Sequence, residues 1–585
     1  MYHDLKLMES KLSAQDKKRL KSIYAPQVVT IPPMDANRNM CVTPDGEIRI
    51  YGAENKVEPN DIGTLVYIAS NDCGLSWKTH YMPENALGAA GYSKITGRYI
   101  SAYPNENRRD LIQSFGESGT WAILNDEGYN SANNRFVKIS ESNVHILKVP
   151  VYMESCNRWF IFGEYVDYSE KPDKFIAVFY SDDNGESWAE VSITEPAPKF
   201  EIKPPHLGTR WQQWSKEPTI VELSNGDLLM FTRTSQNYYY MYRSSDKGES
   251  WSKPEQTNFH GTITMPVLEK LSDGRILFFG CNTQPMPELD LHSVFPPLPE
   301  SIKSGIWEDV FTNRDANHLS ISEDDGKTWI GLRELYLNDV RNYADFRSVG
   351  GVDSRDKSVH QAQMIELPYN KVLIHFGQNT ISRKAVILDV NWLYETERAE
   401  DFRLGIQNVS TQMYVKSNLG GYRGFSGHCA YNRTDGALLV LDPDGNYEEA
   451  LQICRTEDSR LAYQKQGVVW NFPTSMKGTV EVKLKVLESG VNIALTDRWY
   501  NPCDETIADE AHILVPVTEK TNDWVTVKIK YDLTANVSDI TVGDKNYQKD
   551  ICFDAPLGLN YLHIQTLAEE QDYEGTLIKS FKKTV

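Results

Sequence analysis

The chain of 585 residues is poor in the patterns that hold metals or disulfide frameworks. Its eight cysteines are scattered, with no C-x-x-C pair and no regular spacing. We therefore expect neither a zinc site nor a disulfide scaffold, and no other cofactor is indicated.

Long apolar runs are also missing. No stretch of 18 apolar residues occurs, so the sequence predicts no membrane span. Residues 1–24 are charged throughout and lack the apolar segment of a signal peptide. As written, the sequence predicts a cytoplasmic protein, or a secreted one if a signal was removed.

Positive charge is in deficit. The chain has 61 lysines and arginines against 81 aspartates and glutamates, which gives a formal net charge of −20. This balance argues against binding to nucleic acid or to an anionic membrane surface. An acidic substrate would have to be held by a local group of arginines, because the net negative charge of the protein repels it.

Aromatic residues, in contrast, are abundant, and an octapeptide repeats. Aromatics make up 11% of the chain, which suits β-structure and sugar-stacking sites. The pattern Ser-x-Asp-x-Gly-x-(Ser/Thr)-Trp occurs at 70–77, 181–188, 244–251 and 322–329, and 114–121 is a decayed copy without the Asp and Gly. Each intact copy follows an apolar β-run, so we expect a hairpin in which Asp and Gly form the turn and Trp packs onto the sheet.

The octapeptides resemble the Asp boxes of sialidase-like β-propellers, where each box joins the two outer strands of a blade. The resemblance covers residues 30 to 398 and implies that the boxes themselves are structural. Alternating runs ending in DG-type turns predict the inner strands of six blades, which start near residues 36, 90, 143, 216, 262 and 360. The chain is thereby identified as a member of the sialidase superfamily, with an all-β fold.

The sequence pattern changes after about residue 400, and no further octapeptide copies occur there. β-rich segments such as 478–486, 524–531 and 558–567 are similar to those of a laminin-G or concanavalin-like β-sandwich. The N-terminal segment from Asp4 to Ile23 is expected to be a helix, with Ser13 and Asp16 forming a capping box. The predicted domains are a helical segment at 1–29, a six-bladed catalytic propeller at 30–400 and a β-sandwich at 401–585.

The segment from Trp214 to Arg233 is the most specific local match to a sialidase. Glu217 begins one strand and Arg233 ends the next, so a hairpin would present both side chains at the same rim, where they can form an ion pair. The alternative is an ion pair that only stabilises the blade. The resemblance implies a proton-transfer role for Glu217 and substrate binding by Arg233, and we place Trp214 with the substrate-binding residues.

Three further positions follow from the same resemblance. Arg314 precedes the strand that leads into the fourth box, as does one arginine of the sialidase carboxylate clamp. Arg38 stands near the start of the first blade, but the Arg-Ile-Pro motif expected there is absent. Asp61 is the nearest equivalent of the acid/base aspartate, with a solvated loop carboxylate as the alternative.

The expected nucleophile is also absent. Sialidases carry a tyrosine at the start of the last inner strand, where this sequence has Gln361 beside His360. Glutamine cannot attack, whereas histidine can act as a general acid or base near neutral pH. His360 is therefore predicted to be catalytic and Gln361 to bind substrate.

Three functions are compatible with these residues. The first is an exo-acting glycoside hydrolase that releases an acidic sugar from a non-reducing end. The second is a propeller polysaccharide lyase, in which arginine neutralises a uronate carboxylate and His360 or a tyrosine abstracts the α-proton. The third is a carbohydrate-binding propeller without turnover. In each case the expected partner is a carbohydrate, and no metal is expected.

Overall fold

The computed structural model describes most of the chain. The residues described are 4–33, 39–54, 63–104, 119–166, 172–200, 214–261, 263–285, 314–338, 358–377, 382–411, 413–416, 431–434, 436–445, 447–456 and 465–585. Among them the fold is almost entirely β, as expected. No helix within these ranges is both long and apolar enough to cross a membrane.

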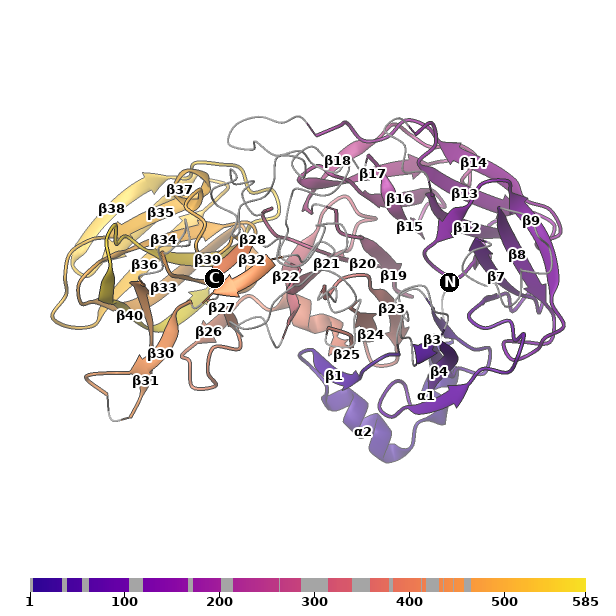
Figure 1. Cartoon of the computed structure of the whole chain (residues 1–585), viewed down its shortest axis with the longest axis horizontal. Coiled ribbons are helices and arrows are strands. Elements are labelled where there is room, and N and C mark those ends of the chain that lie inside the picture. Colours follow the sequence, from indigo (N-terminus) through magenta and orange to yellow (C-terminus); the bar gives the residue numbers. More distant parts are fainter. Residues whose placement is uncertain are drawn as a thin grey trace.

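Six small antiparallel sheets lie between residues 27 and 389 of the described chain, and Figure 1 shows them arranged in a propeller-like ring. We number them along the chain. Sheet 1 has β2 (Met40–Val42), β3 (Ile48–Glu54), β4 (Thr64–Ser70) and β5 (Lys78–Tyr81). Sheet 2 has β6 (Gly91–Tyr92), β7 (Tyr99–Pro104), β8 (Thr120–Asn125) and β9 (Arg135–Ser140). Sheet 3 has β10 (Val144–Ile146), β11 (Val151–Met153), β12 (Arg158–Tyr165), β13 (Ile176–Ser181) and β14 (Ala189–Ile193).

The other three sheets follow the same order of strands. Sheet 4 has β15 (Lys216–Glu222), β16 (Leu228–Arg233), β17 (Tyr238–Ser244) and β18 (Glu255–His260). Sheet 5 has β19 (Val267–Lys270), β20 (Ile276–Gly280), β21 (Ala316–Ser322) and β22 (Ile330–Leu337). Sheet 6 has β23 (Gln363–Leu367), β24 (Lys371–Phe376) and β25 (Lys384–Asp389), and its fourth strand is β1 (Gln27–Thr30).

The pairing of β1 with β25 joins the start of the chain to the last sheet of the ring. Gln27 lies opposite Ile387, and Val28 lies opposite Val386. Because β1 comes from the predicted helical segment at 1–29, this strand was not anticipated from the sequence. Sheet 6 thus combines one strand from the start of the ring segment with three strands from its end. The ring cannot open at this sheet without breaking the backbone hydrogen bonds between β1 and β25.

The four intact boxes form the expected turns. In the second box the Ser181 hydroxyl donates to Asp183 at 2.8 Å and accepts from the Gly185 amide at 2.8 Å, and Trp188 Nε1 donates to the Gly185 carbonyl at 3.0 Å. The bonds of the serine repeat in the other three boxes. Trp188 packs against the hydrophobic cluster shared by sheets 2 and 3. Each box therefore fixes its own hairpin and also packs against the sheet before it.

The N-terminal helix is broken in two, so the single helix expected from Asp4 to Ile23 is wrong. The two pieces are α1 (Leu5–Lys11) and α2 (Ala14–Ser22). Ser13 caps α2, and its Oγ accepts from the Asp16 amide at 3.1 Å. The expected cap at Ser13 is confirmed, and because an N-cap residue has a non-helical backbone, it interrupts the helix there.

The C-terminal part of the chain contains two larger sheets. The first has β26 (Arg398–Glu400), β30 (Leu438–Leu441), β31 (Glu449–Arg455), β33 (Lys477–Val486), β36 (Val525–Asp532), β37 (Val537–Val542), β38 (Lys545–Asp550) and β40 (Asp572–Thr584). The second has β27 (Val409–Ser410), β32 (Gly467–Ser475), β34 (Val491–Thr496), β35 (Ile513–Val517) and β39 (Leu559–Thr566). Short elements complete the part: the hairpin β28 (Met413–Lys416) and β29 (Tyr431–Thr434), and helix α5 (Ile507–Glu510). Both sheets contribute side chains to one hydrophobic cluster.

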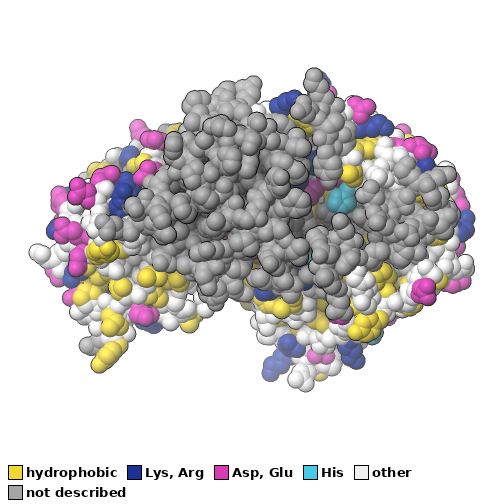
Figure 2. Space-filling model, in the orientation of Figure 1, with side chains coloured by type: hydrophobic (Ala, Val, Ile, Leu, Met, Phe, Trp, Pro, Cys, Tyr) yellow, Lys and Arg dark blue, Asp and Glu magenta, His cyan; other side chains and the backbone are white. Residues whose placement is uncertain are grey.

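The C-terminal part packs against sheets 4 and 5. Trp499 is fully buried, and its amide donates to the Asn282 carbonyl at 3.0 Å while its carbonyl accepts from the Gln284 amide at 2.7 Å. Asp497 Oδ2 lies 2.9 Å from His260 Nε2 at the end of β18. Figure 2 shows charged side chains of both signs around the edge of the face in view.

Candidate functional site

Glu217 and Arg233 form a buried ion pair at one end of sheet 4. Glu217 lies at the start of β15 and Arg233 ends β16, and Arg233 Nη1 lies 2.9 Å from Glu217 Oε2. The two side chains are only 4% and 8% exposed. The β15–β16 register pairs Lys216 with Arg233, which explains why the hairpin brings these two rim residues together.

A second, partly buried carboxylate adjoins this pair. Glu164, on β12 of sheet 3, accepts a hydrogen bond from the Glu217 amide at 2.8 Å. Burial by itself would raise the pKa of Glu164, but His145 and the positive charges of Lys216 and Arg233 hold that pKa well below its usual range. These neighbours therefore favour the ionised form of Glu164.

In sheets 4, 5 and 6, one residue at or just before the first strand has a left-handed backbone. The φ angles are +47° at Glu217, +52° at Ile263 and +59° at Gln361. Left-handed geometry is uncommon for any residue but glycine and is costly for a β-branched one such as isoleucine. Elsewhere such angles recur at the fourth position of each intact box (Cys73, Asn184, Lys247 and Asp325), where a turn explains them. At Glu217 the angle falls where the β15–β16 register shifts between Lys216 and Thr219. Backbone strain of this kind concentrates at functional sites.

Arg314 and His360 form a second group beside the first. Arg314 is 2% exposed, and its Nη2 donates to the Ile263 carbonyl. His360 is 1% exposed and lies edge-on to Phe279, with ring centroids 6.2 Å apart. Burial, and then the positive charge of Arg314, holds the pKa of His360 well below its usual range, so its ring is neutral.

Backbone hydrogen bonds connect the two groups. The Ile263 amide donates to the Thr234 carbonyl at 2.9 Å, next to Arg233. The Val359 amide donates to the Arg314 carbonyl at 3.0 Å, next to His360. The rims of sheets 4, 5 and 6 are thus tied together, and Glu217, Arg233, Arg314 and His360 lie along one connected edge.

The other predicted site residues are placed differently. Gln361 is 9% exposed and continues the same edge. Trp214 is 7% exposed and packs edge-on against Phe175 at 5.6 Å, within a hydrophobic cluster of sheets 3 and 4. Arg38 and Asp61 lie outside the described residues.

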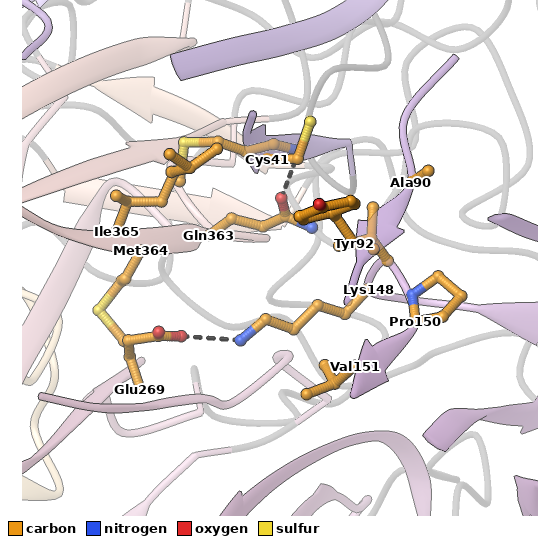
Figure 3. Close-up of a pocket in the computed structure, with 14 residues that line it drawn as sticks. Cys41, Ala90, Tyr92, Lys148, Pro150, Val151, Glu269, Gln363, Met364 and Ile365 are labelled. Carbon is orange, nitrogen blue, oxygen red and sulfur yellow. Dashed lines mark hydrogen bonds and ion pairs between the residues drawn. The ribbon is translucent and has the colours of Figure 1, made fainter. Parts of the chain in front are cut away.

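A cavity of about 70 Å³ lies among the first strands of the ring. Figure 3 shows Lys148 reaching toward Glu269, with 2.7 Å between Lys148 Nζ and Glu269 Oε2. Gln363 Oε1 accepts from the Met40 amide at 2.6 Å, which turns its buried Nε2 toward Tyr92. Within the described residues this nitrogen has no hydrogen-bond partner.

The sequence did not single out the polar residues of this cavity. Lys148 and Glu269 are 121 residues apart, and neither belongs to a motif. Their proximity arises because separate sheets turn their first strands toward a common centre. Gln363 is two residues beyond Gln361, so the cavity adjoins the edge that holds the predicted site.

No metal-binding group stands out in the described part of the chain. It contains no cluster of three or more His, Cys, Asp or Glu residues that could hold an ion.

Residues 143–345 match a family model described as a BNR repeat-like domain. This part of the chain is a BNR-repeat domain. The match confirms the predicted BNR-type repeats in this region of the chain. The matched region holds three of the four intact boxes together with Glu217, Arg233 and Arg314. His360 and Gln361 lie beyond the end of the BNR-repeat domain.

Solved structures with similar outlines include sialidases. A mutant of Trypanosoma rangeli sialidase displaying trans-sialidase activity is 10% identical, with 96% of this chain and 95% of that chain covered and a TM-score of 0.35. T. rangeli sialidase in complex with sialic acid is 11% identical, with 96% and 91% covered and a TM-score of 0.35. A protein of unknown function from Dyadobacter fermentans DSM 18053 is 14% identical, with 62% and 98% covered and a TM-score of 0.36. Likeness at this level does not indicate shared chemistry, and no curated protein matches this chain.

Proposed function

We propose that the protein is a glycoside hydrolase of the sialidase superfamily that removes an acidic sugar from a non-reducing end. The observation that carries this proposal is the edge where sheets 4, 5 and 6 meet, with two buried arginines and one buried glutamate. Two guanidinium groups can hold a carboxylate bidentately, and Glu217 supplies a carboxylate for proton transfer. Burying such groups without use would cost stability.

The proposal extends to the architecture. We infer that the six sheets are the six blades of a propeller spanning about residues 30–400, closed by β1, and that the two larger sheets form a β-sandwich spanning about 401–585. In a propeller, the first strands surround the axis and loops at one end form the site. This arrangement agrees with the cavity among β2, β6, β11, β19 and β23.

The first test compares Glu217→Gln with the wild type on aryl glycosides of sialic acid and of uronic acids. We expect kcat to fall by about 10²-fold or more, because an amide cannot transfer a proton as a carboxylate does. Glu222→Gln, on the same strand at its far end, is the matched control and should keep full activity. Thermal unfolding of both variants separates lost chemistry from lost folding, since Glu217→Gln also leaves Arg233 without its counter-charge. Wild-type protein that cleaves none of these glycosides would overturn the hydrolase.

A uronate lyase is the second candidate. The observation that favours it is the buried guanidinium of Arg314, because a guanidinium can neutralise a uronate carboxylate and so acidify the neighbouring α-proton. Absorbance of an unsaturated uronate product would distinguish elimination from hydrolysis on the same polysaccharide.

A further inference from the structure

His145 and Glu164 form a histidine–carboxylate pair that the proposed roles do not use. His145 lies on β10 directly opposite Glu164 on β12, so both side chains project from the same face of sheet 3. His145 Nδ1 is 3.5 Å from Glu164 Oε1. The His145 side chain is 30% exposed, so solvent or a ligand can reach it.

The carboxylate is fixed in place from the other side. Glu164 Oε2 accepts the Glu217 amide at 2.8 Å, at the residue whose backbone is left-handed. Lys216, which also faces Glu164, donates its Nζ to the Tyr165 carbonyl at 2.6 Å. The same carboxylate therefore contacts His145 with one oxygen and the Glu217 backbone with the other.

We propose that His145 is a proton-transfer residue of this site and that Glu164 is the positioning residue that orients its ring. A carboxylate at Nδ1 favours the tautomer with the proton on Nδ1, which leaves Nε2 as the basic nitrogen. The inference rests on the proposed glycosidase function. It supplies a base where this sequence has Gln361 in place of the sialidase tyrosine.

The step balances as a hydrolysis. A water oxygen forms a bond to the anomeric carbon while His145 Nε2 takes one of its protons. The glycosidic C–O bond breaks, and its electron pair goes to the leaving oxygen, which takes a proton through Glu217, the proton-transfer residue of the proposed function. Glu217 regains that proton from solvent. His145 then returns its proton to solvent, so one water is consumed.

Other histidines of the ring are less suited to this role. His318, His360 and His375 are 0%, 1% and 1% exposed. Burial lowers the pKa of each of these three, to about 3 for His318 and His375. A ring that cannot reach water or accept a proton near neutral pH is a packing element or a neutral donor.

The first arm of the test needs no substrate. An NMR pH titration of the His145 ring in the full-length protein is compared between wild type and Glu164→Gln. The Glu164 carboxylate stabilises the imidazolium while Lys216 and Arg233 oppose it, so the variant should titrate about one pH unit lower. Assignment comes from the signal that disappears in His145→Gln. An unchanged titration in Glu164→Gln would overturn the pair.

The second arm measures turnover of the aryl glycoside that the wild type cleaves best. His145→Gln should lower kcat/KM by about 10²-fold and remove the rise in rate with pH through the titration of His145. His80→Gln, at an exposed position on β5, is the matched control. Full activity and an unchanged pH profile in His145→Gln would overturn the proposal while the hydrolase stands. Absence of turnover in the wild type would overturn both the hydrolase proposal and the catalytic role of His145. The NMR titration would then show whether Glu164 still interacts with the His145 ring as a structural pair.

Discussion

At Glu217 a single residue meets three constraints. Its side chain pairs with Arg233 at 2.9 Å, its amide donates to Glu164 at 2.8 Å, and its φ angle is +47°. The pairing follows from a two-strand hairpin and could be inferred from the spacing of Glu217 and Arg233. The amide contact depends on a neighbouring sheet, and the left-handed backbone lies where the β15–β16 register shifts, so neither could be inferred from the spacing.

Asp504, in the C-terminal part, is a buried carboxylate without a cation. Burial raises its pKa to about 6, although Thr506 donates to its Oδ1. Its Oδ2 has no hydrogen-bond partner among the described residues. The folded state must therefore either hold the proton or bury a charge.

We predict that Asp504→Asn stabilises the protein at pH 7.5 by about 1–3 kcal/mol, as two units of pKa correspond to at most about that free energy. Because the folded pKa lies above the unfolded value, the wild type loses stability as the pH rises from about 4 to about 6. The gain of the variant should therefore shrink toward pH 4. Urea unfolding of wild type and variant at pH 4 and at pH 7.5 measures this gain in stability. An equal gain at the two pH values would contradict the raised pKa of Asp504.

At the scale of elements, the boxes pack each sheet of the ring against the sheet before it. A Cβ added at Gly185 would lie 2.6 Å from Ile100 on sheet 2, and one added at Gly248 would lie 2.8 Å from Phe160 on sheet 3. Each turn is thus pressed against the preceding sheet. The boxes were expected to be structural, and this packing gives the physical reason.

We predict that Trp188→Ala lowers the free energy of unfolding by about 2–3 kcal/mol, somewhat less than for a fully buried tryptophan, because Trp188 is half-buried. Urea unfolding measures the change, and Tyr81→Ala, at a side chain 70% exposed on β5, is the control with little effect. A loss below about 0.5 kcal/mol for Trp188→Ala would show that the second box does not hold sheets 2 and 3 together.

At the scale of the whole molecule, the C-terminal part is built into the ring. Thr283 and Trp499 form a parallel bridge, and Arg498 Nε donates to Gln284 Oε1 at 2.7 Å. The adjoining Asn282 amide donates to His318 Nδ1 at 3.1 Å, and His318 in turn adjoins His360. The C-terminal part therefore supports the segment behind the candidate site, although it contributes none of the predicted residues.

We predict that Asp497→Asn destabilises the contact between the two parts by about 3 kcal/mol, since it leaves Arg498 and His260 without their buried carboxylate. Differential scanning calorimetry of the full chain should show a lower first transition, separated from the second. Asp539→Asn, at an exposed position on β37, is the control. An unchanged scan for Asp497→Asn would mean that this contact does not couple the two parts.

The sequence by itself determined what is local in this protein. Turn chemistry and a period of two placed the boxes and the starts of the first strands within a few residues, because both depend on neighbours along the chain. The helix break at Ser13 was misjudged, since a capping residue can begin a second helix as well as a first. Only the tertiary structure decided that β1 joins sheet 6, that Trp214 packs inside a cluster and that His145 and the Glu217 amide both contact Glu164. Those contacts join residues far apart in the chain, and they are set by how whole sheets pack, which no local pattern encodes.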